Sequence, residues 1–88
     1  MSEPYRVVVP RRVVKMIHRL PNPIQQRIRV AIELIALDPR PPKAVALTGF
    51  DNVLRIRVGD YRIVYEVDDG IRVIAIVYAG HRRDAYRS

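Results

Sequence analysis

Three arginines near the middle of the sequence are spaced so that a β-hairpin would bring their side chains together. Arg55 and Arg57 precede Gly59-Asp60, a two-residue turn signal between β-branched segments, and Arg62 follows it. With this turn, Arg57 pairs with Arg62, and all three arginines alternate onto one face of the sheet. Like charges directly opposite each other destabilise a sheet. A solvated face is the alternative, but the pattern favours a site for an anion such as phosphate, which arginine binds through paired hydrogen bonds.

A second group of candidate residues lies near the end of the sequence. The segment from Gly80 to Arg87 contains three arginines, a histidine and a tyrosine, namely Arg82, Arg83, Arg87, His81 and Tyr86. A basic tail is often only a solvated end of the chain. Here it leaves an apolar segment through Gly80, so we expect it to emerge at the edge of the sheet and to fold toward the arginines of the hairpin.

The charge of the chain points to an anionic partner. Sixteen Lys and Arg against nine Asp and Glu give a net charge of +7, and fourteen of the sixteen cations are arginine. Such an excess on a small domain is typical of proteins that bind nucleic acid, an acidic protein, or both. Arginine favours planar, bidentate contact with phosphate or carboxylate. A high net charge alone also fits a domain that is merely soluble. The positions of the arginines in the fold therefore have to distinguish solubility from the binding of an anionic partner.

The composition excludes several classes of protein. The chain has no cysteine, which excludes disulfides and thiolate zinc sites, and its two isolated histidines predict no metal site of another kind. No run of about eighteen apolar residues predicts a membrane span, and the N-terminus does not resemble a secretion signal. The 88 residues suffice for one core only. We expect a single soluble, intracellular domain over residues 1–88, without cofactor or metal.

Periodicity and turn signals predict the elements that would position these residues. Apolar spacing of three and four indicates helices, and β-branched runs bounded by turn residues indicate strands. The predicted elements are a strand at 5–9, helices at 11–20 and 23–38, and strands at 53–58, 61–67 and 71–78. The order β-α-α-β-β-β predicts an α+β domain: an N-terminal strand, a two-helix hairpin, and a three-stranded antiparallel meander on which the helices pack.

The last predicted strand adds an apolar surface beside the arginines. If Asp69-Gly70 is a second two-residue turn, alternation places three side chains on the arginine face, namely Val73, Ala75 and Val77. They would form an apolar floor next to Arg62. A nucleobase could lie on this floor, with its phosphate over the arginines.

The hairpin segment from Leu54 to Tyr65 resembles the central hairpin of the RelE/ParE toxin superfamily, and Gly80-His81-Arg82 with Tyr86 is similar to the C-terminal signature of its RelE-type members. The resemblance spans nearly the whole chain. It implies a RelE-like fold and a cytoplasmic toxin that enters the ribosomal A site and cleaves the mRNA there. It also implies a heteromeric complex with an acidic RelB-like antitoxin, which covers the sheet and displaces the tail.

The resemblance also implies roles for individual residues. The positions that match the family's catalytic and RNA-binding positions are Arg55, Arg57, Arg62, Arg82 and Tyr86. One departure affects the chemistry. Well-known members carry lysines where this chain has Arg55 and Arg57, and part of their chemistry has been assigned to those lysines.

RNA cleavage without a metal requires a base for the 2′-hydroxyl, stabilisation of charge at phosphorus, and protonation of the leaving 5′-oxygen. Arginine stabilises charge well but is a poor base, because its pKa lies above about 12. We therefore expect Tyr86 to be the base, since surrounding arginines favour its phenolate, and Arg82 to act on the leaving oxygen. His81 is the rival base, because histidine titrates near neutral pH. The expected catalytic residues are Arg62, Arg82 and Tyr86, and the expected RNA- or phosphate-binding residues are Arg55, Arg57, Arg83 and His81.

Two other functions remain open at this stage. A ParE-like member would inhibit DNA gyrase without nuclease chemistry, and a basic RNA-binding module would bind RNA without cleaving it. Gly80 and Arg82 together with Tyr86 favour the ribosome-dependent, metal-independent endoribonuclease over both.

Overall fold

The computed structural model describes residues 3–50 and 52–81. Its elements are β1 (Arg6–Val8), α1 (Arg11–His18), α2 (Asn22–Leu37), β2 (Val45–Ala46), β3 (Val53–Val58), β4 (Tyr61–Asp68) and β5 (Val73–His81). The predicted α+β order is confirmed, with one additional short strand, β2, between the second helix and residue 53, where no element was predicted. The tail residues Arg82, Arg83 and Tyr86 lie outside the described residues.

Proline delimits both helices. Pro10 directly precedes α1 and Pro21 directly precedes α2, and the carbonyl of each accepts hydrogen bonds from backbone amides of the following turn. Pro23 lies in the first turn of α2, where its fixed φ fits and its missing N–H leaves no hydrogen bond unmade. Asp38, which ends α2, has extended backbone because the following Pro39 disfavours the helical conformation.

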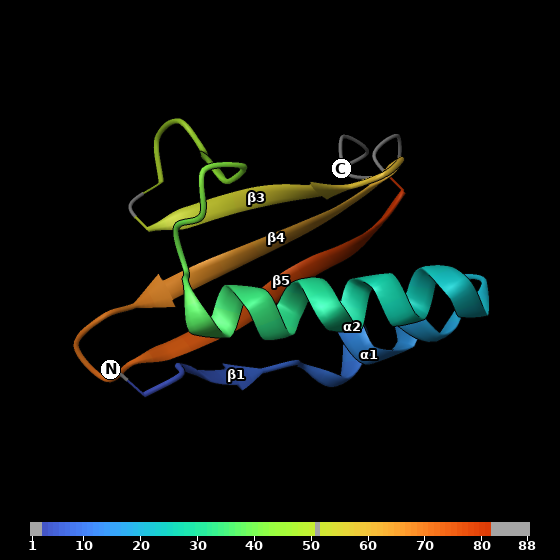
Figure 1. Cartoon of the computed structure of the whole chain (residues 1–88), viewed down its shortest axis with the longest axis horizontal. Coiled ribbons are helices and arrows are strands. Elements are labelled where there is room, and N and C mark those ends of the chain that lie inside the picture. The colour runs from blue at the N-terminus through green and yellow to red at the C-terminus, as the bar shows by residue number, and fades with distance from the viewer. Residues whose placement is uncertain (1–2, 51, 82–88) are drawn as a thin grey trace.

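The five strands form one sheet in the order β1-β5-β4-β3-β2. The predicted antiparallel meander of β3, β4 and β5 is confirmed, but β1 joins it parallel to β5, so the sheet is mixed. Both helices lie on one side of the sheet (Figure 1) and cover its apolar face. The largest fully buried side chains are Val13, Ile28 and Ile35 of the helices and Ile63, Tyr65, Val67, Ile74 and Ile76 of the sheet. The opposite side, which no helix among the described residues covers, is called the open face below.

The connection between β4 and β5 is longer than predicted. Asp68 pairs directly with Val73, so four residues, not two, join the strands. The side chain of Asp68 accepts hydrogen bonds from the backbone amides of Gly70 and Ile71, at 3.0 and 3.3 Å. Arg72 then adopts a left-handed conformation with φ of 54°. The expected two-residue turn is therefore wrong, because the Asp68 carboxylate stabilises a wider turn.

A β-bulge in β5 changes which side chains reach the open face. Tyr65 pairs with Ile76 but Val64 pairs with Tyr78, which leaves Val77 as the extra residue. The carbonyl of Val77 accepts a hydrogen bond from the guanidinium of Arg12 in α1, at 3.3 Å. Beyond the bulge the alternation of side chains is reversed. Val73 and Ala75 do lie on the open face, but they pair with Asp68 and Glu66, two or more rows from Arg62, and Val77 does not lie beside Arg62 either. The prediction of an apolar floor next to Arg62 is therefore wrong.

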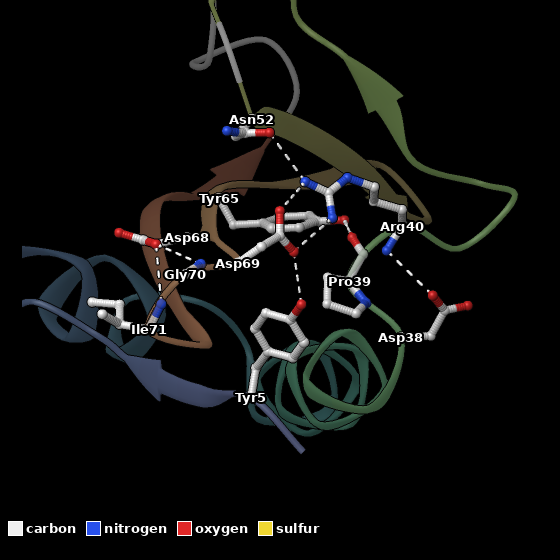
Figure 2. Close-up of polar contacts among 10 residues, drawn as sticks. All are labelled: Tyr5, Asp38, Pro39, Arg40, Asn52, Tyr65, Asp68, Asp69, Gly70 and Ile71. Atoms are coloured by element: carbon white, nitrogen blue, oxygen red, sulfur yellow. Dashed lines mark hydrogen bonds and ion pairs between the residues drawn. The ribbon is translucent and has the colours of Figure 1, made fainter. Parts of the chain in front are cut away.

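A network of polar side chains joins the end of the sheet where β4 turns into β5 to the N-terminal segment (Figure 2). The guanidinium of Arg40 donates two hydrogen bonds to the carboxylate of Asp69, at 2.9 and 3.1 Å, and a third to Asn52. The hydroxyl of Tyr5 donates to the same carboxylate at 2.7 Å. We call Tyr5, Arg40, Asn52 and Asp69 the clasp, because they join four segments that are far apart in the sequence.

A buried tyrosine anchors the loop between α2 and β2, which contains Pro39, Pro41 and Pro42 and is called the proline-rich loop, next to the clasp. The ring of Tyr65 is fully buried, and its hydroxyl donates a hydrogen bond of 2.7 Å to the carbonyl of Pro39 (Figure 2). Burial raises the pKa of Tyr65 to about 12. The neutral phenol therefore links the core to the loop that follows α2.

Candidate phosphate-binding site

Cross-strand pairing divides the open face into rows that run across the strands. The row nearest the β3–β4 hairpin, called the arginine row, consists of Gly80, Arg62 and Arg57. The next row, called the tyrosine row, consists of Tyr78, Val64, Arg55 and Val45. The acidic residues of β4, Glu66 and Asp68, lie in the two rows farther away. Positive charge is therefore concentrated at the end of the open face next to the β3–β4 hairpin, which we call the hairpin end.

The predicted pairing of the arginines is confirmed. Arg57 and Arg62 are direct partners across β3 and β4, and Arg55 lies one row away on the same face. The Nε atom of Arg62 is buried, whereas Arg57 is exposed to solvent. The hairpin turn fixes this register, because Gly59 has the left-handed φ of 62° that a two-residue hairpin requires. The structure thus brings three guanidinium groups to one region of the open face, where a phosphate could accept bidentate hydrogen bonds.

A fourth arginine reaches the same end of the molecule from α2. The terminal nitrogens of Arg27 lie 3.4 Å from the position that a Cβ on Gly59 would occupy. The guanidinium therefore packs against the hairpin turn. Sequence reasoning missed Arg27, because a helical arginine gives no local sign that it contacts a turn more than thirty residues away.

Tyr78 is a candidate residue that the sequence analysis did not identify. It lies in the tyrosine row beside Val64, diagonally across from Arg62. Its hydroxyl donates a hydrogen bond to the carbonyl of His81, at 3.2 Å. The bulge places it on the open face, so alternation without the bulge pointed to Val77 instead.

His81 is separated from the arginine row. It pairs with Tyr61 on the side of the sheet that faces the helices, and the two rings meet edge to face with centroids 5.4 Å apart and an angle of 78°. Arg62 follows Tyr61 in β4 and Gly80 precedes His81 in β5, and both of these positions belong to the open face. The structure therefore does not bring the His81 ring together with Arg57 and Arg62, with which it was expected to bind RNA.

Arg82, Arg83 and Tyr86 lie outside the described residues, so their roles stay predictions. Within 3–50 and 52–81, no group of three His, Cys, Asp or Glu side chains is arranged to hold a metal ion. None of the helices in the described part of the chain is long and apolar enough to cross a membrane.

A groove of about 990 Å³ lies between α2, β3 and the proline-rich loop. Three exposed apolar side chains of α2 line it at helical spacing, namely Val30, Leu34 and Leu37. Its charged lining residues are Arg27, Lys43, Arg57 and Asp38, an excess of two positive charges. Arg57 therefore belongs to both the groove and the arginine row. The helical spacing of the three apolar residues was visible in the sequence, but it could not be distinguished from a second core-facing stripe.

The sequence of this chain matches a known protein family. The family model described as the ParE toxin of the type II toxin–antitoxin system parDE matches residues 5–86. A protein of Methanocaldococcus jannaschii named putative toxin RelE1 is 30% identical over 87 residues, covering 96% of this chain and 97% of its own length.

Solved structures give the same result. The archaeal RelE–RelB complex from Pyrococcus horikoshii contains a chain with a TM-score of 0.79 and 29% identity, covering 96% of this chain and 98% of that one. The RelBE2 toxin–antitoxin complex from Mycobacterium tuberculosis contains one with a TM-score of 0.76 and 25% identity, covering 90% and 99%. With the family model spanning most of the sequence and the fold matching over nearly its whole length, this chain belongs to the RelE/ParE superfamily of type II toxin–antitoxin toxins.

Proposed function

We propose that this toxin is a cytoplasmic, ribosome-dependent endoribonuclease that cleaves mRNA in the ribosomal A site without a metal ion. The observation that carries the proposal is the direct pairing of Arg57 with Arg62 on the open face, with Arg55 one row away. A phosphodiester placed over these residues would receive bidentate, charge-assisted hydrogen bonds from their guanidinium groups.

In the proposed reaction, the 2′-oxygen attacks the adjacent phosphorus and the bond from phosphorus to the 5′-oxygen breaks. A 2′,3′-cyclic phosphate and a free 5′-hydroxyl result. Arg62 stabilises the charge that develops on the phosphoryl oxygens, while Arg55 and Arg57 hold the phosphate. Tyr86, as its phenolate, accepts the 2′-hydroxyl proton, and Arg82 polarises the leaving 5′-oxygen or donates the proton that it gains, with Arg83 contacting the RNA backbone. His81 is a weaker candidate for the base, since its ring lies on the other side of the sheet from Arg62.

We propose that cleavage depends on the ribosome, because the arginines of the sheet stabilise charge but do not transfer protons. Guanidinium groups stay protonated at neutral pH and cannot act as the base. The proposed base, Tyr86, is a phenol with an ordinary pKa of about 10, so proton transfer at neutral pH is not favoured by the side chain alone. We therefore propose that the ribosome holds the mRNA in a geometry suited to in-line attack, and such positioning can account for a large part of a rate enhancement. Purified toxin should cleave ribosome-bound mRNA much faster than the same mRNA free in solution.

We also propose that an acidic RelB-like antitoxin binds this toxin, as RelB does in the Pyrococcus horikoshii complex with its RelE chain. The groove supports this partner, because exposed apolar residues of α2 lie beside an excess of positive charge. An amphipathic helix with acidic flanks fits both features. Since Arg57 lines the groove and the arginine row, bound antitoxin would compete with RNA.

The alternative is gyrase inhibition, which the name of the matching family model favours. One pair of measurements separates the two functions. Mapping of mRNA 5′ ends after induction of the toxin should show new ends within codons, while purified gyrase should supercoil DNA at its normal rate in the presence of the toxin. Intact mRNA together with inhibited gyrase would overturn the proposed function.

A further inference from the structure

We propose that Tyr78 is the platform on which one base of the bound RNA stacks while the arginine row holds the neighbouring phosphate. This inference rests on the proposed function and adds a contact to the same substrate. Tyr78 would be a positioning residue, with no part in proton transfer.

The position of Tyr78 suits this role. It lies on the open face in the row next to Arg62, because the bulge at Val77 reverses the alternation of β5. Residues on adjacent strands that are offset by one such row lie about 7–8 Å apart, within reach of long and aromatic side chains. An aromatic ring and a guanidinium at this spacing can contact the base and the phosphate of the same short stretch of RNA.

The ring of Tyr78 is held in place by its own strand. A Cβ added to Gly80 would lie 2.8 Å from the Tyr78 hydroxyl oxygen and 3.1 Å from Cζ, so the end of the ring lies directly over the Gly80 backbone. The hydroxyl is hydrogen-bonded to the His81 carbonyl, while the side chain stays partly exposed. A ring that is already ordered loses little conformational entropy when a ligand stacks on it.

The chemistry of the surrounding surface points to a base rather than a second phosphate. Val64 lies directly beside Tyr78 and separates it from Arg55 in the same row, and the next row on β4 carries the carboxylate of Glu66. That carboxylate would repel a phosphate, whereas a base is uncharged. Stacking of bases on aromatic side chains tolerates any base, because every base has a π-face. The site is therefore expected to accept different nucleotides, with the ring fixing where the base lies.

The test uses the full-length toxin with programmed ribosomes whose A-site codon contains 2-aminopurine and a 2′-O-methyl group that prevents cleavage. Stacking on an aromatic ring quenches the fluorescence of 2-aminopurine. We expect quenching with wild type and with Tyr78→Phe, and its loss with Tyr78→Leu. On unmodified mRNA, Tyr78→Leu should lower cleavage under subsaturating toxin by about 5- to 150-fold, which is the range that one base–aromatic stack supplies.

Two further variants complete the design. Gly80→Ala leaves the Tyr78 side chain intact but displaces its ring, because the new methyl group would overlap the hydroxyl end. It should therefore reduce quenching and cleavage even if Tyr78→Leu proves too unstable to measure. Tyr5→Leu removes a tyrosine from the clasp, at the other end of the sheet, and should leave quenching and the cleavage rate unchanged below its unfolding temperature.

Each outcome decides between the proposals. Wild-type quenching and cleavage in Tyr78→Leu or in Gly80→Ala would overturn the platform and leave the nuclease function standing. Equal losses in Tyr78→Phe and Tyr78→Leu would assign the effect to the hydroxyl, which also overturns the platform. Wild-type toxin that leaves ribosome-bound mRNA intact would overturn the nuclease function, and the platform with it.

Discussion

The two ends of the sheet arrange charge in opposite ways. At the end where β4 turns into β5, Arg40 and Asp69 form an ion pair at 2.9 Å that also involves Tyr5 (Figure 2). At the hairpin end, Arg57 and Arg62 are direct cross-strand partners. Opposite charges at the first end hold distant segments together. At the second end, like charges face each other across two strands, a pairing that disfavours the sheet in itself.

This difference separates a region that serves the fold from a region that serves a ligand. The clasp contains its own counter-ion, so it is complete within the chain. The arginine row instead places like charges in direct register on the open face, an arrangement suited to an anionic ligand, and regions that bind charged ligands commonly give up some stability for that purpose. Substitutions at the clasp should therefore change stability and spare activity, and substitutions around the arginine row should do the reverse.

The largest effect is expected from the tail that we propose completes the hairpin end. Tyr86→Phe removes one oxygen and keeps the ring, so ribosome binding should survive while proton transfer does not. Loss of a general base costs about 100- to 10,000-fold in rate. Single-turnover cleavage of ribosome-bound mRNA measures this, with His81→Asn as the control that should lose much less. The reverse result would identify His81 as the base, and small losses in both would mean that the site acts by orientation and electrostatics alone.

The next largest effect is expected at Arg62. Arg62→Gln removes one of two facing charges, so the domain should unfold at the same or a higher temperature. Cleavage should fall by about 100- to 1,000-fold, as when a donor to a developing oxyanion is removed. Arg40→Gln is the matched variant at the clasp, and it should unfold at a lower temperature with its cleavage rate unchanged. If both variants lose stability and keep activity, the distinction between the two ends is wrong.

A smaller effect is expected in the groove, which shares Arg57 with the arginine row. Leu34→Glu places a charge among exposed apolar side chains that we propose the antitoxin covers. Removal of a central apolar anchor typically costs at least about tenfold in affinity. Calorimetric titration with the antitoxin measures this, and cleavage by the free toxin should be unaffected. Glu33→Ala, on the same helix outside the groove, is the control, and equal affinities for the two variants would place the antitoxin elsewhere.

The smallest effect is expected from Asp69, because its ion pair is exposed to water. The hydrogen bonds from Arg40 and then from Tyr5 hold the pKa of the Asp69 carboxyl below its ordinary value. A carboxyl whose pKa is lower in the folded state stabilises the fold above its unfolded pKa, and this contribution is lost as the pH falls through the folded pKa.

The unfolding temperature of wild type should therefore decrease more steeply below about pH 4 than that of Asp69→Asn. At neutral pH the variant should unfold at a slightly lower temperature. Circular dichroism at a series of pH values measures both curves, and the difference between them removes the contribution of the other carboxylates. Parallel curves would mean that the ion pair does not contribute to stability.

Much of the fold was predictable because its signals are local. The β3–β4 hairpin has a two-residue turn that needs only Gly59 in a left-handed conformation, and this fixes the pairing of Arg57 with Arg62. The helices have apolar residues at helical spacing and prolines at their ends. Each signal acts within a few residues of the structure that it specifies, so no tertiary contact is needed to interpret it.

The alternation of side chains in β5 was mispredicted because it depends on the core. Ile76 and Ala79 are both buried, although residues three apart in a regular strand point to opposite faces. A bulge at Val77 resolves this conflict, and it moves Tyr78 to the open face. Burial in the core thus decides the alternation of β5, and a turn signal cannot reveal it.

The sequence by itself determined the excess of arginine, the order of the elements and the facing pair of arginines, since composition, periodicity and a short turn specify them. The tertiary structure decided what lies around that pair: Gly80 with the Tyr78 ring over it, Arg27 against the hairpin turn, and the groove beside α2. It also formed the clasp from residues 5, 40, 52 and 69. These contacts join segments far apart in the chain, and they form only because packing the helices on the sheet brings those segments together.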